Sequence, residues 1–516
     1  MKHSEDIDSK SQFMRDESNA LHADPDAVPG IWFPESEDDI IEILDLARSM
    51  RQPITISGAG TGLTGARVPV HGGLVISMEN MIEVGNSGNN QIVERQGLAG
   101  TIRIALRPDS NIAIVSPGLS LSELDATLPG NWMYPPDPTE RLASIGGTVS
   151  TNASGARCFN YGPTRNWIDG LRVVLADGDI LNLRRGETSA DKSGNLIFSS
   201  ESGKEFNIKI PDYKMPVVKN AAGLYSKEGM DLVDLFVGSE GILGVISEAK
   251  TRLMQKDPDI ASDLAFFRNS GNALDLVDAL RAEKDEGILA LEYFDGNALN
   301  FIRDQYPEIP EEAGAAVLVE LRDREKKDLA GLYQRLQKHN CIEDWCATNP
   351  MDMKRMKDFR HSLPESINTY LRLHESQKLG TDLAVPLQHF RKMMRHYRNA
   401  EKDFEEKFPR EGPHCVTYGH VGDCHAHFNF ISMNREERDF ARRLYAELAT
   451  LAVEMGGTVS AEHGAGKRML NIGGKSIPYL QLMYGEHGLR EIARVKRALD
   501  PGGMLNPGNM VPAGWG

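Results

Sequence analysis

The sequence predicts an α+β protein built from at least two packed regions. Its 516 residues exceed what one hydrophobic core usually fills. Short apolar runs and glycine-rich turns dominate the first half of the chain, up to about residue 255. Longer charged stretches with helical periodicity follow, for example residues 273–286 and 323–338. No internal repeat or low-complexity linker is present, so we expect the second region to begin near residue 255.

Charge and cysteine content argue against several classes of protein. The net charge of −16 disfavours a nucleic-acid partner, which would need clustered Lys and Arg. Five cysteines without a repeated ligand spacing disfavour a disulfide framework or an iron–sulfur site. The polar, acidic start does not resemble a signal or transit peptide, and no apolar run approaches the ~20 residues of a membrane span. We expect a cytoplasmic protein, with peripheral membrane contact left open.

The first elements follow in the order helix, strand, glycine segment, strand. Residues 36–49 carry apolar side chains at helical spacing behind a capping residue, Ser36. Residues 53–57 and 73–77 are short apolar runs typical of strands. Between them lie residues 58–65, here called the first glycine segment. It is followed by a strand and not by a helix, which excludes a Rossmann dinucleotide site.

The first glycine segment has the composition of an anion-binding loop. Four of its eight residues are glycine, so backbone N–H groups can converge on a pyrophosphate without a lysine. A flexible connection between two strands would explain the same composition. Residues 144–155, the second glycine segment, form a further loop of small and hydroxyl residues beside residues 135–138. Two such loops favour two walls of one extended cofactor site.

Further along, residues 171–175 and 180–183 flank Asp177-Gly178, a pair favoured in tight hairpins. After Glu486 a helical stretch ends near Leu499 and glycine- and proline-rich turns follow. We expect this tail to return to the first region.

Histidines and carboxylates gather in two places late in the chain. Residues 420–429 hold three histidines around a Gly-Asp turn, and Glu462-His463 follows beyond a predicted helix. Two histidines and a carboxylate are a common set for zinc or manganese that leaves positions open for a substrate. Polar residues of an ordinary turn remain the alternative.

These motifs together resemble the FAD-binding oxidoreductase family of vanillyl-alcohol oxidase and p-cresol methylhydroxylase (PCMH), in its branch of D-lactate, D-2-hydroxyglutarate and glycolate dehydrogenases. The resemblance covers nearly the whole chain and includes residues 236–244, 420–423, 461–464 and 506–508. It implies a two-part FAD-binding domain of the PCMH type with an inserted α+β, ferredoxin-like substrate cap. The implied division is residues 1–254 for the FAD-binding domain, 255–470 for the cap with its metal site, and 471–516 for a C-terminal segment returning to the FAD-binding domain.

The resemblance also implies FAD as the cofactor. Some members attach the flavin to a histidine in the first glycine segment, which contains none here, so we expect non-covalent FAD. The expected FAD-binding residues come from both glycine segments and three further places: Gly58, Ala59, Gly60, Thr61, Gly62, Leu63, Thr64, Pro136, Asp137, Ser144, Gly146, Gly147, Thr148, Thr151, Asn152, Ser154, Gly155, Gly241, Ile242 and Asn506.

Residues of the reaction site are implied in the same way. The expected ligands of zinc or manganese are His420, His427 and Glu462, and His463 is the expected base. Arg360 matches the arginine that binds the substrate carboxylate, and Asn429 matches a further substrate contact. A solvated helix arginine is the alternative interpretation of Arg360.

The chain departs from this pattern in two places. Cys424 and His425 stand where the family usually shows Gly and Asn, so His425 is open to replacing or supplementing a ligand. Gly380 and Ala384 stand where a lysine and a serine are frequent, which weakens the case for a dicarboxylate substrate unless Lys378 compensates.

The implied activity is oxidation of a small D-2-hydroxy acid to the 2-oxo acid, with deprotonation by a histidine beside the metal and hydride transfer to flavin. A quinone or an electron-transfer protein is the expected acceptor, and a homodimer is possible. Three alternatives stay open: a non-redox enzyme similar to alkyl-dihydroxyacetone-phosphate synthase, the flavin subunit of a glycolate oxidase-like complex, and a catalytically silent binding protein. The synthases use adjacent histidines, which this chain lacks.

Overall fold

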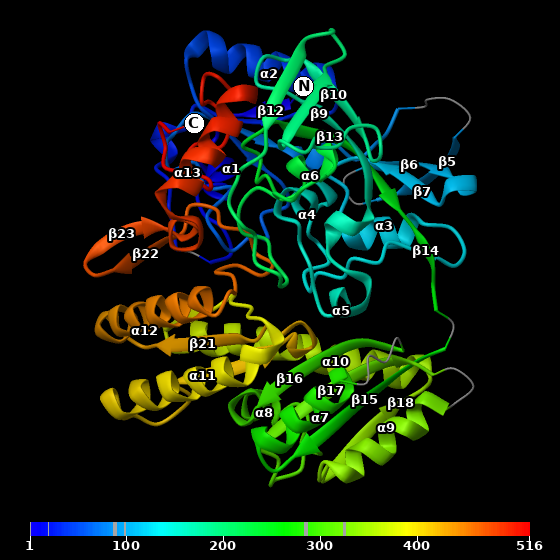
Figure 1. Cartoon of the computed structure of the whole chain (residues 1–516), viewed down its shortest axis with the longest axis vertical. Helices are drawn as coiled ribbons and strands as arrows, with labels where there is room; N and C mark the ends of the chain where they lie inside the picture. The colour runs from blue at the N-terminus through cyan, green and yellow to red at the C-terminus, as the bar shows by residue number, and fades with distance from the viewer. Residues whose placement is uncertain are drawn as a thin grey trace.

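The computed structural model describes residues 2–18, 20–85, 90–97, 100–257, 259–282, 287–323 and 327–515. It consists of two bodies, one above the other in Figure 1. The upper body combines the first half of the chain with the C-terminal helix α13 (Tyr479–Leu499), and the lower body holds most of the residues in between. The structure is therefore α+β, as predicted.

The amino-terminal part of the upper body contains a small sheet with the strand order β1-β2-β4-β3. Its strands are β1 (Lys2–Ser4), β2 (Ile31–Phe33), β3 (Ile54–Ser57) and β4 (Leu74–Ser77), and β4 is parallel to both β2 and β3. Helix α2 (Glu37–Met50) covers it and begins as expected, with Ser36 accepting a hydrogen bond from the Asp39 N–H. From the C-terminal tail, Leu505 forms a parallel bridge with Ile54.

The second sheet of the upper body is antiparallel and has six described strands in the order β10-β9-β13-β7-β6-β5. They are β5 (Gln91–Gln96), β6 (Thr101–Arg107), β7 (Ile112–Val115), β9 (Ile168–Val174), β10 (Ile180–Arg184) and β13 (Val245–Arg252). The predicted hairpin joins β9 to β10, and Gly178 takes a positive φ of 86° in its turn. Alternating burial along β10 shows that one face of this strand is solvated.

The second glycine segment is not a loop, contrary to our prediction. Residues Ile145–Thr151 form helix α4, with Ser144 as its N-cap and Asn152 as a left-handed C-cap. A Cβ at Gly146 would stand 2.7 Å from Pro117 Cβ and 3.1 Å from the Pro117 carbonyl oxygen, so this glycine allows close packing of the helix. Further short elements complete this body: α1 (Ile7–Ser11), α3 (Leu121–Thr127), β8 (Trp132–Met133), α5 (Cys158–Tyr161), β11 (Asn195–Ser199), β12 (Glu205–Lys209), α6 (Leu232–Phe236) and β14 (Met254–Gln255).

The lower body, here called the cap, is built on a seven-stranded antiparallel sheet within the described residues, with the order β18-β15-β17-β16-β20-β21-β19. Its first four strands alternate with helices and lie in the 4-1-3-2 order of a ferredoxin-like fold, which confirms the predicted cap. The elements are β15 (Ile260–Phe267), α7 (Ser270–Ala282), β16 (Ile288–Asp295), α8 (Gly296–Ile302), β17 (Ala315–Arg322), α9 (Lys327–Lys338) and β18 (Glu343–Ala347). Residues 283–286 and 324–326, at the ends of two predicted helices, lie outside the described residues.

The rest of the cap extends this sheet and covers it with long helices. The added elements are α10 (Pro350–Leu373), β19 (Gln377–Gly380), α11 (Leu387–Lys407), β20 (Cys415–Gly419), β21 (His427–Ser432) and α12 (Arg435–Glu454). The hairpin of β22 (Met469–Ile472) and β23 (Lys475–Pro478) then leads back to α13 in the upper body. No helix within the described ranges combines the length and apolar character needed to cross a bilayer.

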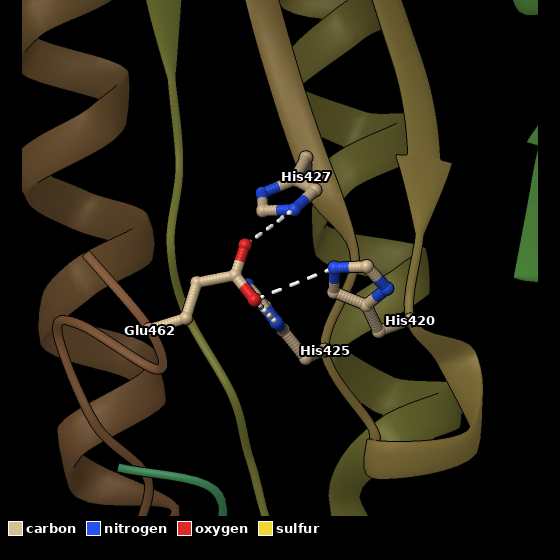
Figure 2. A group of neighbouring side chains, drawn as sticks. All are labelled: His420, His425, His427 and Glu462. Carbon is tan, nitrogen blue, oxygen red and sulfur yellow. Dashed lines mark ion pairs between the residues drawn. The ribbon is translucent and has the colours of Figure 1, made fainter. Parts of the chain in front are cut away.

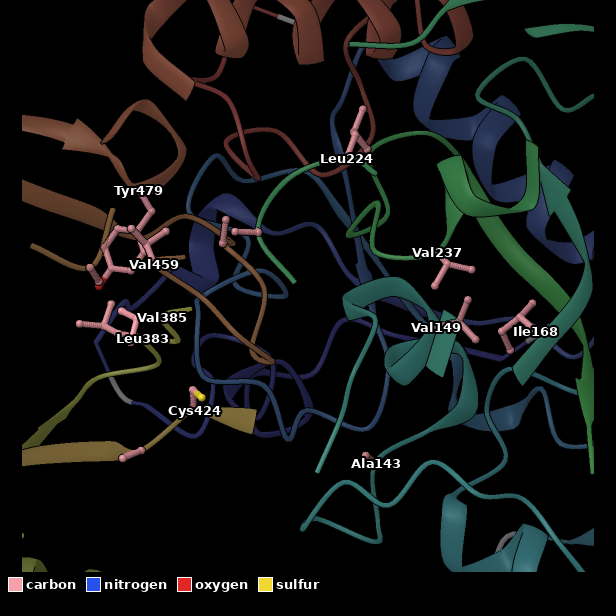
Figure 3. Packing of buried hydrophobic residues seen from close by; sticks show 14 of the residues in the cluster. Ala143, Val149, Ile168, Leu224, Val237, Leu383, Val385, Cys424, Val459 and Tyr479 are labelled. Carbon is pink, nitrogen blue, oxygen red and sulfur yellow. The ribbon is translucent and has the colours of Figure 1, made fainter. Parts of the chain in front are cut away.

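Apolar packing connects the two bodies. One buried cluster includes Val149 and Val237 of the upper body together with Leu383 and Cys424 of the cap (Figure 3). The ion pair between Arg157 and Glu320 crosses the same boundary at 2.8 Å. This packing holds the cap against the part of the upper body that contains helix α4.

Candidate active site

The three histidines of residues 420–429 converge on one carboxylate. His420 follows β20, His427 begins β21, and His425 lies in the turn between them. The turn folds back because Cys424 takes a left-handed conformation and the His425 N–H donates to the His420 carbonyl. Figure 2 shows all three rings directed at Glu462, which follows α12.

Three histidine nitrogens and one lysine ammonium lie at ion-pair distances from the Glu462 carboxylate. His427 Nε2 lies 3.2 Å from Oε1, His420 Nε2 lies 3.4 Å from Oε2, and His425 Nδ1 lies 3.9 Å from Oε2. The buried ammonium of Lys219 donates to Oε2 at 2.8 Å. Burial alone would raise the pKa of Glu462, but Lys219 and His420 hold that pKa well below its usual value. The carboxylate is therefore ionised and able to bind a cation.

Each histidine also meets an acceptor with its outer nitrogen. His420 Nδ1 lies 2.7 Å from Glu292 Oε1, and His427 Nδ1 lies 3.3 Å from the Thr381 carbonyl oxygen. His425 Nε2 lies 3.0 Å from Asp382 Oδ1, at ion-pair distance but without hydrogen-bond geometry. Metal-binding histidines typically donate their second ring N–H to such an acceptor, which fixes the ring and leaves the inner nitrogen free for a metal.

His463 lies beside this cluster and is more open to solvent. Its Nδ1 is 3.2 Å from Asp382 Oδ2 and its Nε2 is 3.4 Å from Glu462 Oε1, while about 26% of its side chain is exposed. Burial disfavours the charged imidazole, but the Asp382 carboxylate raises the pKa of His463 above its ordinary value. Ser460 donates to the same carboxylate at 2.6 Å and fixes its position. Asp382 therefore holds the His463 ring in a fixed orientation at the edge of the cluster.

Arg360 reaches the cluster from α10 through Glu292. Its Nε lies 3.1 Å from Glu292 Oε2, and its Nη2 donates to the Thr139 hydroxyl of the upper body at 3.2 Å. Burial opposes ionisation of Glu292, but His420 and Arg360 lower its pKa to about 2. The side chain is 13% exposed, so Arg360 is not the solvated helix arginine that we considered as an alternative.

Asn429 lies on β21, two residues after His427, and Lys378 lies on the neighbouring strand β19. Asn429 is buried and donates to the carbonyl oxygens of Val416 and His427. It pairs with Gly380 across β19 and β21, and a side chain at Gly380 would meet its amide oxygen. Lys378 is exposed and lies two residues from Gly380, on the same face of β19.

The segments expected to hold FAD lie close together. A Cβ at Gly58 would stand 2.6 Å from Ser144 Oγ and 3.6 Å from Gly147 Cα, so the two glycine segments are in contact. Asn506 accepts a hydrogen bond from the Ile56 N–H and donates to the Glu240 carbonyl, which brings the tail to the first segment. Among the expected residues, Ile242 is fully buried in the apolar core, whereas Ala59 and Gly62 are exposed.

A short connection joins these segments to the histidine cluster. The backbone N–H of Lys467 donates to the Thr64 carbonyl, and its ammonium donates to the Ala66 carbonyl at 2.8 Å. Lys467 lies four residues after His463. The first glycine segment therefore packs against the loop that carries the expected base.

Sequence reasoning missed two charged residues of the site, Glu292 and Lys219. Glu292 is a charged residue within the buried strand β16, and that anomaly was the available signal. Lys219 lies in an irregular stretch and shows no local signal. Asp382, midway between Gly380 and Ala384, was not among the predicted site residues either.

Known proteins are similar to this chain in sequence and in fold. A family model described as "FAD binding domain" matches residues 28–184, and one described as "FAD linked oxidases, C-terminal domain" matches residues 256–510. The glycolate oxidase subunit GlcD of Bacillus subtilis is 30% identical over 495 residues, covering 94% of this chain and 89% of the relative. A D-lactate dehydrogenase of Archaeoglobus fulgidus is 28% identical, with 93% and 90% coverage.

A D-2-hydroxyglutarate dehydrogenase of Stutzerimonas stutzeri is 24% identical, covering 98% of this chain and 96% of the relative. Among solved structures, an alkyldihydroxyacetonephosphate synthase superposes with a TM-score of 0.67 at 15% identity, covering 98% of this chain and 82% of the synthase. That likeness concerns the fold alone.

Proposed function

The chain belongs to the family of FAD-linked oxidases and dehydrogenases that act on hydroxy acids, and from this membership we propose that it oxidises a D-2-hydroxy acid to the corresponding 2-oxo acid. We further propose that a divalent cation, zinc or manganese, assists at His420, His427 and Glu462. The observation that carries the proposal is the convergence of inner histidine nitrogens on an ionised Glu462, beside an oriented His463.

The donor set fits a divalent cation. Imidazole nitrogens and a carboxylate oxygen suit zinc and manganese, and the candidate ligand atoms lie within 4.8 Å of one another. Lys219 supplies the positive charge that balances Glu462 in this arrangement. A bound cation lowers the pKa of a substrate hydroxyl next to it.

The glycine segments fit a non-covalent FAD. A Cβ at Gly58 would stand 2.6 Å from Ser144 Oγ, so the place where the two glycine segments meet excludes a side chain there. Glycine-rich backbone of this kind is typical of loops that bind a pyrophosphate through N–H groups. The histidine nearest to the first glycine segment in the sequence, His71, lies outside that segment and beside Gly508. We therefore propose a dissociable cofactor. A bound flavin supplies the hydride acceptor.

Residues of this chain remove the substrate proton and bind the substrate. His463, oriented by Asp382, removes the hydroxyl proton at Nε2. Arg360 retains N–H donors beyond its contacts with Glu292 and Thr139, and these bind the substrate carboxylate. Asn429 contributes an amide on the same sheet face as His427.

A chelation experiment tests this function. We expect the purified flavoprotein to reduce an artificial dye with D-lactate, D-2-hydroxyglutarate or glycolate as the electron donor. Dialysis against a chelator should abolish that activity, and added zinc or manganese should restore it. Full activity in metal-free protein would remove the cation from the proposal, and no activity with any hydroxy acid would refute the proposal itself.

A second candidate is a flavin subunit of a larger complex. The Bacillus subtilis relative is itself a glycolate oxidase subunit, and this favours the candidate. Affinity purification of the chain from its own cells at low salt tests it. Stoichiometric partner chains would support a complex, and a single chain with full dye-linked activity would contradict it.

A further inference from the structure

We infer that His425 is a third imidazole ligand, so that this chain holds its cation with three histidines and one carboxylate. The inference rests on the proposed metal site at His420, His427 and Glu462. The inference concerns position 425, where this sequence has histidine and the family usually has asparagine.

The position of His425 is that of a ligand. Its ring is fully buried, with 0% exposure, and no hydrogen-bond partner among the described residues serves its Nε2 or its inner nitrogen, Nδ1. That nitrogen faces Glu462 Oε2 at 3.9 Å, inside the cluster drawn in Figure 2. A buried polar atom without a partner is costly, and a cation in the cluster would satisfy it.

The surroundings of His425 resemble those of its two neighbours. Its outer nitrogen lies 3.0 Å from Asp382 Oδ1, at ion-pair distance but without hydrogen-bond geometry, whereas His420 and His427 hydrogen-bond to Glu292 and to the Thr381 carbonyl. Its ring centroid lies 4.5 Å from that of His427 and 5.5 Å from that of His420. Each of the three rings therefore has an oxygen on its outer side and an inner nitrogen directed at Glu462, which is the arrangement of histidine ligands.

Asp382 then connects the ligand to the base. Its Oδ1 faces His425 Nε2, and its Oδ2 faces His463 Nδ1. One buried carboxylate thus orients both a proposed ligand and the proposed base. We therefore assign Asp382 as a positioning residue and not as a ligand.

Four protein ligands restrict the choice of ion. A tetrahedral ion would be filled by three imidazoles and a carboxylate and would have no position left for a substrate. An ion that accepts six donors keeps two positions open, enough for the two oxygens of a 2-hydroxy acid. The inference therefore favours a six-coordinate ion such as Mn²⁺ or Co²⁺ over four-coordinate zinc.

Cobalt binding to the metal-free flavoprotein tests the inference. The Kd for Co²⁺ is measured by competition with a chromophoric chelator, and histidines bound to Co²⁺ are counted by X-ray absorption of the wild type, which needs no variant. The variants are His425→Asn, His427→Asn as a loss-of-ligand reference, and His396→Asn on α11 as a histidine outside the site. Flavin content and Tm report whether each variant folds.

We expect three imidazoles in the wild type and two in H425N. The Kd should rise at least 10–100-fold in both H425N and H427N, a range typical even for loss of an outer-shell partner of a metal site, and stay unchanged in H396N. Two imidazoles in the wild type, or a Kd that rises in H427N but not in H425N, would overturn the third ligand and leave the proposed site intact. Failure of the wild type to bind Co²⁺, Mn²⁺ or Zn²⁺ would overturn the proposed metal site and this inference with it.

Discussion

Replacing Glu292 with glutamine tests how a buried carboxylate supports the histidine cluster. The buried carboxylate accepts from His420 at 2.7 Å and pairs with Arg360 at 3.1 Å, and both its side chain and that of His420 are 4% exposed. Glutamine keeps the shape and one acceptor oxygen but removes the charge, so Arg360 loses its buried partner. We therefore expect E292Q to lower the free energy of unfolding by about 3–5 kcal/mol, the cost of breaking a buried ion pair, and to weaken metal binding by about 10–100-fold, because the neutral amide is a poorer acceptor for His420.

A matched control comes from the same helix. Arg355 of α10 pairs with Glu308 at 3.0 Å, but these side chains are 45% and 57% exposed. Because exposed pairs contribute about 0–1 kcal/mol, Glu308→Gln should leave both stability and metal affinity nearly unchanged. Thermal unfolding and competition with a chromophoric chelator measure the two quantities. Equal behaviour of E292Q and E308Q in both assays would refute the role of Glu292 in supporting His420.

Three further predictions concern the base, the glycine segment and a buried carboxyl group. His463→Ala should retain FAD yet slow flavin reduction by about 100-fold or more in stopped-flow measurements, and unchanged reduction would contradict its role as base. Gly58→Ala places a Cβ 2.6 Å from Ser144 Oγ and should weaken FAD binding about tenfold, whereas Gly85→Ala, with open space around it, should not; equal flavin content in both purified variants would contradict this. Burial raises the pKa of Asp263 to about 7, with a contribution from Asp344. Because this folded-state pKa exceeds the unfolded value, Asp263 lowers stability progressively from about pH 4 to pH 7, by up to roughly 4 kcal/mol above pH 7. Asp263→Asn should therefore raise the Tm of the protein at pH 8 but not at pH 4, and an equal gain at both pH values would contradict the assignment.

Much of the fold was predictable because short sequence patterns determine where several helices, strands and turns lie. The apolar face and the Ser36 cap located α2, and the Asp177-Gly178 pair located the β9–β10 turn. The same reasoning failed for α4, because a helix rich in glycine has little intrinsic propensity and depends on close packing with Pro117. Sheet order was also beyond local patterns, since β13 pairs with strands far away along the chain.

Local pattern pointed to the site only where its residues are close in sequence, and the roles expected of Glu462, His463 and Arg360 came from the family resemblance. His420, His425 and His427 share one turn and drew attention together. Glu292 lies 128 residues from His420, and Lys219 lies 243 residues from Glu462, so only the folded chain brings them together. Lys219 lowers the pKa of Glu462, and Glu292 contacts the outer nitrogen of His420, and no local motif encodes either interaction.

The most direct test of the account is anaerobic bleaching of the flavin absorbance by a panel of D- and L-2-hydroxy acids, with and without added zinc or manganese. The account predicts rapid bleaching by at least one D-acid, little by its L-enantiomer, and a dependence on the cation. If the protein carries flavin but no 2-hydroxy acid reduces it, the proposed dehydrogenase activity is wrong.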